Sequence, residues 1–353
     1  MCDMRIDRRH VRKPNSTCWR TAASDNAARL AESDDVLQDS YLRWALSGDV
    51  GHISAEGVTF GRWAVSRVYD ITTGASDVTD KVQVEISGAP QTMLATLYGR
   101  AADAAAEHPI LGDTFAKDLV SRLDYDWSKT GLTTRHASSL TMRSAHFDNW
   151  ARQFLAAHER AVVLHLGCGL DSRVFRLNPG AGVEWYDVDY PDVIALCERL
   201  YPSREHHHLV PASVTDPAWL QAIPPDRPAL LLAEGLTMYL TEQDGLAVLE
   251  RVVEHFCSGE LQFDVLNWFG ILGEKLNPVV RRSGATMSWA INGPADILRA
   301  VPGVRLLAAI SAFDAQTFRQ MTDQQSAVYR LLARAVALIP AVRATSQYLR
   351  FGF

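Results

Sequence analysis

The sequence predicts an α/β fold with a doubly wound, mostly parallel β-sheet. Short apolar runs alternate with helical patterns through the second half of the chain, and strands separated by helices of this length pair in parallel through right-handed crossovers. The first run ends in a glycine turn at Gly167 and Gly169. Asp189 follows the second run, 20 positions after Gly169. A glycine turn followed by an acid at this distance is typical of sheets that bind an adenosine-containing ligand.

Helical patterns precede the predicted sheet. Leu94, Leu97, Tyr98 and Ala101 share one helical face, and the segment 109–112, which begins with proline and ends with glycine, interrupts the chain after it. A third, longer pattern places apolar residues on one face up to about residue 158. We expect helices over residues 91–105, 114–123 and 140–158.

The predicted strands follow in order. Five apolar runs cover residues 162–166, 183–188, 208–212, 229–233 and 261–266. Helical patterns over 191–200 and 243–256 separate some of them. Two further runs, 304–308 and 348–353, flank a long helical pattern over 323–338. They fit closing strands at the edge of the sheet, one of which can be antiparallel.

Composition restricts the class of protein. The 353 residues are 47% hydrophobic and 22% charged, as in an ordinary globular chain. A net charge of −6 gives no basic surface for nucleic acid, and no apolar run approaches the roughly 18–20 residues that span a bilayer. The five cysteines are scattered without CxxC spacing, which favours a reducing compartment and argues against a structural zinc site. We expect a cytoplasmic protein without a nucleic-acid or membrane partner.

The chain divides into an N-terminal extension, residues 1–87, and a domain over 88–353. Residues 1–30 are polar and charged without sustained periodicity, so we expect them to be disordered. Residues 34–80 contain Trp44, Phe60, Trp63 and Tyr69, too many large apolar side chains to leave in water. We expect this part to pack as a lid or as a contact in a homodimer.

The glycine turn Gly167-Cys168-Gly169 distinguishes between two adenosine-containing cofactors. Glycine lets the backbone turn sharply and approach a ligand closely. A nicotinamide dinucleotide site needs a third glycine where Ser172 stands, and Asp171 places negative charge where a pyrophosphate would bind. S-adenosylmethionine has no phosphate and carries a positive sulfonium. The turn therefore favours S-adenosylmethionine.

Two acids follow predicted strands at the edge where such sheets bind ligands. Asp189 suits the ribose hydroxyls, although it could instead cap the helix that begins at Pro191. Glu234 follows the run 229–233 and could be a plain exposed loop acid. The apolar residues before it favour a buried position, where an acid needs a partner.

Several motifs together resemble the leucine carboxyl methyltransferase family, in its bacterial branch. The similarity runs from about Gly88 to the C-terminus and leaves residues 1–87 outside it. The motifs that carry it are residues 92–101, Arg143 with its neighbours, 165–173, 187–191 and 234–240. The resemblance implies a class I methyltransferase (Rossmann-like) fold with an N-terminal helical cap over the site.

The resemblance also implies roles for the cofactor-binding residues. Arg143 would bind the carboxylate of the methionine moiety, a task that suits a guanidinium, although a surface arginine on a helix is the simpler alternative. Glu234 would lie near the methionine amino group. The expected cofactor residues are Arg143, Gly167, Cys168, Gly169, Asp189, Ser213, Val214 and Glu234.

One motif departs from the family. Ser213 and Val214 stand where its leucine carboxyl members carry an Asp-Leu pair, whose acid contacts the adenine amino group. We therefore expect a weaker or altered adenine contact. The departure also points away from the protein-methylating subgroup.

The acceptor side is less defined. We expect Arg100, Tyr239 and Trp268 to contact the substrate, and residues 267–269 with Trp289 could form an aromatic wall or simply core packing. No catalytic base is identified: His146 and His165 are candidates, but a histidine inside a strand, such as His165, is more often a core residue with its hydrogen bonds satisfied. The run 206–208 is three histidines, but neighbouring strand residues point to opposite faces, so we reject a metal site.

These residues predict an S-adenosylmethionine-dependent O-methyltransferase that acts on a carboxyl or phenol group of a small, polyketide-like natural product. Two alternatives remain open. One is a carboxyl methyltransferase for a protein or peptide C-terminus, which would need a narrow, arginine-lined slot. The other is a non-catalytic, cofactor-binding regulatory protein, which would have no cavity beside the cofactor methyl group.

Overall fold

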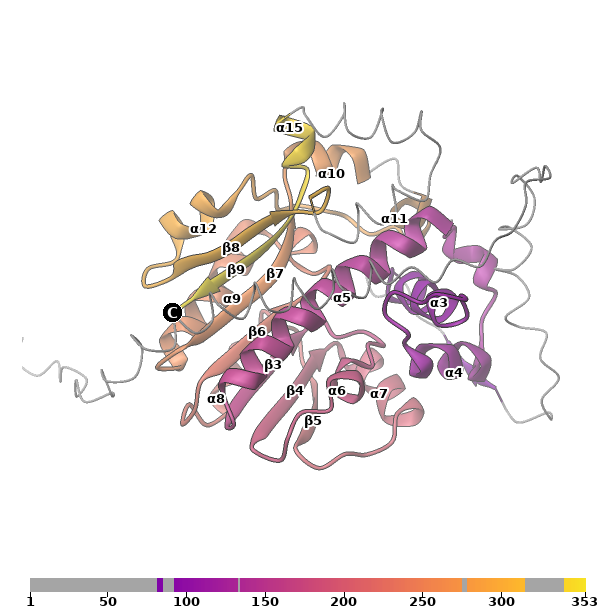
Figure 1. The fold of residues 1–353 in the computed structure, drawn as a ribbon, viewed down its shortest axis with the longest axis horizontal. Coiled ribbons are helices and arrows are strands. Elements are labelled where there is room, and N and C mark those ends of the chain that lie inside the picture. The colour runs from indigo at the N-terminus through magenta and orange to yellow at the C-terminus, as the bar shows by residue number, and fades with distance from the viewer. Residues whose placement is uncertain (1–80, 85–91, 133, 275–277, 315–339) are drawn as a thin grey trace, which may run out of the picture. The chain divides into compact units, whose positions relative to one another are not determined.

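The computed structural model describes residues 81–84, 92–132, 134–274, 278–314 and 340–353 (Figure 1). The expectations for residues 1–80 and 85–87, including the lid or dimer contact, lie outside the described residues, and so does the helix expected over 323–338. None of the described helices has the length and apolarity that a membrane crossing requires.

A seven-stranded sheet forms the centre of the described fold, in the order β5-β4-β3-β6-β7-β9-β8 (Figure 1). The first five strands in this order pair in parallel, whereas β9 is antiparallel to both neighbours. The strands are β3 (Ala161–Leu166), β4 (Val183–Asp189), β5 (His207–Pro211), β6 (Ala229–Ala233), β7 (Gly259–Leu266), β8 (Arg305–Ser311) and β9 (Ser346–Gly352). The predicted doubly wound, mostly parallel sheet with one antiparallel closing strand is confirmed.

Helices connect and cover these strands. The longer ones are α3 (Thr92–Ala104), α4 (Thr114–Arg122), α5 (Thr134–Ala157), α7 (Pro191–Leu200) and α9 (Glu242–His255). The shorter ones are η3 (Trp127–Thr130), α6 (Arg173–Leu177), α8 (Ala218–Gln221), η4 (Thr237–Tyr239), α10 (Trp268–Glu274), α11 (Pro278–Ser283), α12 (Pro294–Ala300) and α15 (Pro340–Arg343). The helix expected to begin at residue 140 begins at 134.

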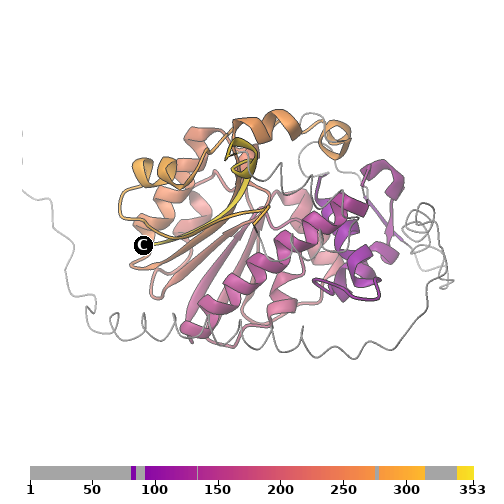
Figure 2. The ribbon, with the colours of Figure 1, turned by 45° about the horizontal axis from the view of Figure 1, so that its top comes forward.

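Both faces of the sheet are buried. On β3, Val162 and Leu164 pack in one cluster with Val252 of α9, while Val163 packs in another with Phe154 of α5. In Figure 2 the magenta helix α5 crosses one face of the sheet. Burying a side chain of this size contributes about 1.5–3 kcal/mol, so an uninterrupted apolar run is stable only in such a two-sided setting.

The helical cap has its own core. Leu94 of α3 and Leu119 of α4 pack with Val193 of α7. A short parallel pair, β1 (Val82–Gln83) and β2 (Leu123–Asp124), lies at the edge of this core, which Val82 also contacts. The domain start at residue 88 stays a prediction, because residues 85–91 lie outside the described ranges.

The sheet register brings the candidate site together. His165 of β3 lies opposite Asp187 of β4 and Leu232 of β6. The carboxyl ends of the three strands are therefore level. The glycine turn, Asp189 and Glu234 consequently meet at one edge of the sheet.

Candidate cofactor and active site

A pocket opens at this edge, between the strand ends and helices α3 and α5. Every predicted cofactor residue lines it, together with two of the predicted substrate residues. These are Arg143, Gly167, Cys168, Gly169, Asp189, Ser213, Val214 and Glu234, with Arg100 and Tyr239. Trp268 is not among the lining residues, and its side chain is 61% exposed at the start of α10.

The glycine turn has the conformation that its residues predict. Gly167 and Gly169 have φ angles of +62° and +53°, which side chains rarely adopt. A Cβ at Gly167 would lie 3.0 Å from Cδ1 of Leu236, and one at Gly169 would lie 3.1 Å from Cβ of Met93. The turn is thus closely packed, and only glycine provides its shape without displacing a neighbour.

Asp189 is tied to the glycine turn. Its carboxylate accepts hydrogen bonds from the backbone N–H groups of Gly169 and Tyr190, both at 2.8 Å. Tyr190, not Asp189, is the N-cap residue of α7, and Pro191 occupies the first turn. The capping alternative is therefore wrong for Asp189. Burial raises the pKa of its carboxyl despite these backbone donors.

Arg143 and Glu234 form a largely buried ion pair at the pocket wall. The Nε of Arg143 donates to Oε1 of Glu234 at 3.0 Å, and Nη1 donates to Oδ2 of Asp264 at 2.9 Å. The Oγ of Ser144 also donates to Oε1 of Glu234, at 2.7 Å. Glu234 is therefore not an exposed loop acid, and Arg143 is not a surface arginine.

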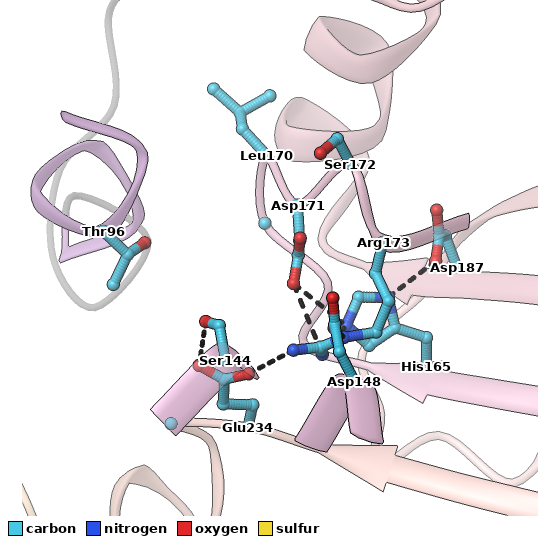
Figure 3. Close-up of polar contacts among 12 residues, drawn as sticks. Thr96, Ser144, Asp148, His165, Leu170, Asp171, Ser172, Arg173, Asp187 and Glu234 are labelled. Atoms are coloured by element: carbon cyan, nitrogen blue, oxygen red, sulfur yellow. Dashed lines mark hydrogen bonds and ion pairs between the residues drawn. The ribbon is translucent and has the colours of Figure 1, made fainter. Parts of the chain in front are cut away.

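Arg173 holds the other oxygen of Glu234 from below the pocket (Figure 3). Burial alone would raise the pKa of the Glu234 carboxyl, but the charges of Arg173 and Arg143 outweigh it and hold that pKa well below its usual range. Glu234 is thus ionised at neutral pH, although it is almost wholly buried. An ionised carboxylate is the form that can accept hydrogen bonds from an ammonium group.

The charge of Asp171 is neutralised within the site. Its carboxylate lies 2.8 Å from Nη1 of Arg176 and 3.3 Å from Nη1 of Arg173. The expectation that Asp171 would repel a pyrophosphate is therefore weaker than the sequence suggested, because its negative charge is already paired.

His165 is a structural residue. Its Nδ1 lies 2.8 Å from Oδ1 of Asp187, and its Nε2 lies 3.3 Å from Nη1 of Arg173. An arginine can only donate, so Nε2 accepts and Nδ1 carries the proton. With both nitrogens occupied, His165 has no position from which to take a proton from a substrate, and the interpretation as a core residue is confirmed.

The other histidines considered in the sequence, His146 and the run 206–208, also have structural roles. His146 packs on Trp150 outside the pocket, and burial, assisted by the charge of Arg350, lowers its pKa to about 4. His206 and His208 both contact Glu184, whereas His207 turns to Asp187. Their alternating directions are those expected for a strand. Within the described ranges, no group of three metal-ligating side chains forms a site.

Two of the residues that we expect to contact the acceptor, Tyr239 and Arg100, line the pocket. Tyr239 is hydrogen-bonded to Thr92, and burial raises the pKa of its phenol. The Nε of Arg100 lies 3.2 Å from Asp113, and its Nη2 donates to the carbonyl of Leu170. Arg100 therefore lines the pocket with its charge already balanced.

The expected aromatic wall does not assemble at the pocket. Trp289 is buried against Gly245, where a Cβ would lie 2.0 Å from its ring. Asn267 accepts the backbone N–H of Gly270 at 2.8 Å and so supports the start of α10. Trp289 is core packing, while Trp268 and Phe269 are exposed.

Comparison with known proteins identifies the family. Residues 93–253 match the leucine carboxyl methyltransferase family. Over 270 residues, the chain is 41% identical to the tetracenomycin polyketide synthesis O-methyltransferase TcmP of Streptomyces glaucescens, which covers 76% of this chain and 98% of that protein. The chain belongs to the leucine carboxyl methyltransferase family. It is also 35% identical over 248 residues to the S-adenosyl-L-methionine-dependent methyltransferase dpfgK of Gibberella zeae, covering 64% of this chain and 83% of that protein.

A solved structure agrees on the fold. The crystal structure of a candidate methyltransferase from Thermobifida fusca YX gives a TM-score of 0.50 at 14% identity and covers 75% of this chain and 94% of that one. The chain is thus an S-adenosylmethionine-dependent methyltransferase with the class I fold, as its motifs predicted.

The pocket of this methyltransferase fits its cofactor. The glycine turn leaves no Cβ between the backbone and the pocket, and three charged groups line it at separate points: Asp189, Glu234 and Arg143. An adenosyl ligand with a ribose and a zwitterionic tail needs these kinds of partner. The role of each residue remains a prediction.

Ser213 and Val214, the residues expected beside the adenine, both line the pocket. The hydroxyl of Ser213 lies 2.9 Å from that of Thr215, and the carbonyl of Val214 accepts the indole N–H of Trp219 at 3.2 Å. Both groups already have partners inside the chain. This arrangement is consistent with the predicted weaker adenine contact, which stays a prediction.

Sequence reasoning gave no role to three charged residues beneath the pocket. Asp148 of α5 accepts from Nε of Arg173 at 2.7 Å and from Nε of Arg176 at 2.9 Å. Asp148 and Arg173 are fully buried. The signal in the sequence was the spacing of Arg173 and Arg176, three positions apart at the start of the helical segment after the glycine turn, which places both on one helical face.

Proposed function

We propose that this methyltransferase transfers its methyl group to an oxygen atom of a small, polyketide-like natural product. The observation that carries the proposal is the likeness to the polyketide O-methyltransferase TcmP, which extends over 98% of that protein. A carboxyl and a phenol are the two acceptor groups that we expect from the sequence. The described pocket favours the carboxyl group.

Three charged residues each bind one part of the cofactor. Arg143 binds the methionine carboxylate, Glu234 binds the methionine ammonium group, and Asp189 accepts hydrogen bonds from the ribose. When bound, S-adenosylmethionine supplies a methyl group on a positively charged sulfur. The chain holds these partners in place through the Arg143–Glu234 pair and the bond between Asp189 and Gly169.

The acceptor side requires mainly positioning. Holding two reactants in the correct geometry can contribute about 7–11 kcal/mol. The hydroxyl groups of Thr92 and Tyr239 lie on the pocket wall and can orient an oxygen acceptor. Because burial raises the pKa of Tyr239, its phenol stays protonated and donates a hydrogen bond instead of acting as a base.

The protonation of the acceptor decides between carboxyl and phenol. A carboxyl group is ionised at neutral pH and needs no base, whereas a phenol with a pKa of about 10 must lose a proton. Among the described lining residues the one histidine is His165, and both of its nitrogens are occupied. This favours an aromatic or polyketide carboxylic acid.

A peptide C-terminus is the less favoured acceptor. Such a substrate would need an unpaired arginine beside the reacting oxygen. Arg100 is balanced by Asp113, and Arg143 is the residue that we propose for the methionine carboxylate of the cofactor, so neither is left for a peptide carboxylate. The described wall is therefore not the arginine-lined slot that a peptide carboxylate would require.

A labelled-methyl transfer screen tests the proposal. Purified protein and S-adenosylmethionine labelled in the methyl group are incubated with aromatic acids, with matched phenols that lack the carboxyl, and with peptides that have a free C-terminus. Label should appear in base-labile methyl esters of the aromatic acids. Transfer only to peptides, or only to phenol ethers, would contradict the proposed acceptor.

A further inference from the structure

Arg173 is a fully buried cation that lies next to the pocket without lining it. Its three guanidinium nitrogens have separate partners. Nε donates to Oδ1 of Asp148 at 2.7 Å, Nη1 lies 3.3 Å from Nε2 of His165, and Nη2 donates to Oε2 of Glu234. Figure 3 shows the side chain reaching from the start of α6 toward Glu234. A lysine has one nitrogen and could not satisfy these three positions together.

Glu234 depends on two arginines that approach from opposite sides. Arg143 and Ser144 of α5 donate to Oε1, and Arg173 of α6 donates to Oε2. With one oxygen held by each helix, the carboxylate cannot rotate without breaking a charge-assisted hydrogen bond. Its orientation toward the pocket is therefore fixed by the chain itself.

From this geometry we propose that Arg173 is a positioning residue, which keeps the Glu234 carboxylate ionised and oriented for the ammonium group of the cofactor. The proposal rests on the function proposed above for Glu234. Arg173 itself touches neither cofactor nor acceptor, because Glu234 lies between it and the pocket. Asp148, which also binds Arg176, holds Arg173 in place.

The charges around Glu234 explain why one arginine is not enough. Arg143 faces it from α5, Asp171 from the loop before α6, Asp264 from β7 and Tyr348 from β9. Arg143 is shared with Asp264. Without Arg173, the one cation left beside Glu234 among the described residues would be Arg143, which Glu234 shares with Asp264. The carboxylates of Asp171 and Asp264 would then disfavour the ionised form of Glu234. A buried acid in such surroundings takes up a proton at a higher pH.

The test is the pH dependence of cofactor affinity in Arg173→Gln. The dissociation constant of S-adenosylmethionine is measured by calorimetry between about pH 5 and pH 8, and the ratio of variant to parent is plotted. Near pH 8, where Glu234 is ionised in both proteins, we expect the dissociation constant of the variant to be only slightly larger than that of the parent. Toward acid pH the ratio should rise by about tenfold per pH unit once Glu234 becomes protonated. Purely structural loosening would weaken binding equally at every pH.

A second readout does not use the cofactor. Infrared difference spectra of the unliganded Arg173→Gln variant should show the C=O band of a protonated carboxyl group at acid pH. That band should be absent from Arg173→Gln/Glu234→Gln, which removes both the cation and the carboxyl and so leaves no unpaired charge between them. If Arg173→Gln does not fold, Arg173→Lys takes its place and should show the same acid effect at lower pH.

Arg176→Gln is the matched control. Arg176 lies on the same helix, is similarly buried and binds Asp113, Asp148 and Asp171, but not Glu234. The Arg176→Gln variant should be less stable than the parent, but the ratio of its dissociation constant to that of the parent should not rise toward acid pH. A flat ratio for every folded Arg173 variant, or an equal acid effect in Arg176→Gln, would overturn the proposal. If instead Glu234→Gln binds the cofactor as tightly as the parent does, the function proposed for Glu234 itself fails.

Discussion

The Nε of Arg143 lies 3.0 Å from Oε1 of Glu234, and this ion pair joins α5 to the loop after β6. The two residues are 91 positions apart and come from different layers of the fold. They are also the residues that we propose for the two charged ends of the methionine moiety. In the structure, the positive and the negative side chain that a zwitterionic ligand requires are paired with each other.

Arg143→Ala should reduce both cofactor affinity and stability. Loss of a charge-assisted hydrogen bond to the cofactor should cost about 1.5–3 kcal/mol of binding. Because Glu234 and Asp264 would lose a buried partner, the free energy of unfolding should also fall, by up to about 3–5 kcal/mol. Calorimetry and urea denaturation measure the two effects. Unchanged cofactor binding in the folded variant would show that Arg143 is only structural.

Gly169→Ala should destabilise the pocket through the backbone. A residue with a Cβ at φ +53° costs about 1–2 kcal/mol, and the new methyl group would also press on Met93. Cofactor affinity should fall as the turn shifts. Gly180→Ala is the control, since a Cβ there meets nothing within 4 Å. Equal unfolding midpoints for the two variants would contradict the account of the turn.

Tyr239→Phe should affect the acceptor and not the cofactor. The change removes the phenol that bonds to Thr92, and one such hydrogen bond is worth about 0.5–1.5 kcal/mol. We expect a loss of up to about tenfold in kcat/KM for the acceptor, with unchanged affinity for S-adenosylmethionine. Tyr186→Phe, on β4 beside His208, is the control and should behave like the parent. A selective loss of cofactor affinity would place Tyr239 on the other side of the pocket.

Asp187→Asn should change the acid sensitivity of the fold. Burial opposes ionisation of Asp187, but hydrogen bonds from His165 and His207 prevail and lower its pKa to about 2. A lowered pKa contributes stability above the unfolded value of about 3.9, here about 2 kcal/mol, and this is lost as pH falls toward 2. The difference in unfolding free energy between parent and variant should therefore narrow between about pH 4 and pH 2. A difference that stays constant over this range would refute the assignment.

The sheet and the strand ends were predictable because apolar runs and glycines are local features. The run at 229–233 has the same bounds as β6, and the acid after it lies in the pocket. The helix at 191–200 likewise has the bounds of α7. A two-sided core requires such uninterrupted apolar strands, so sequence and structure agree there.

The charge pairing was not predictable, because it joins residues that are distant in sequence. Arg143 pairs with Asp264 across 121 positions, and Arg173 pairs with Glu234 across 61. No periodicity connects such partners; only the packed fold brings them together. The same limit explains why the sequence could not decide between a substrate wall and core packing for Trp289, which packs on Gly245 in the structure.

A crystal structure of the protein with S-adenosylhomocysteine would show which residues hold the cofactor. We expect the ribose hydroxyls to lie on Asp189, the amino group on Glu234 and the carboxylate on Arg143, with the glycine turn against the ligand. A ligand bound elsewhere, or in this pocket with its ribose away from Asp189 and its amino acid end away from the Arg143–Glu234 pair, would contradict these assignments.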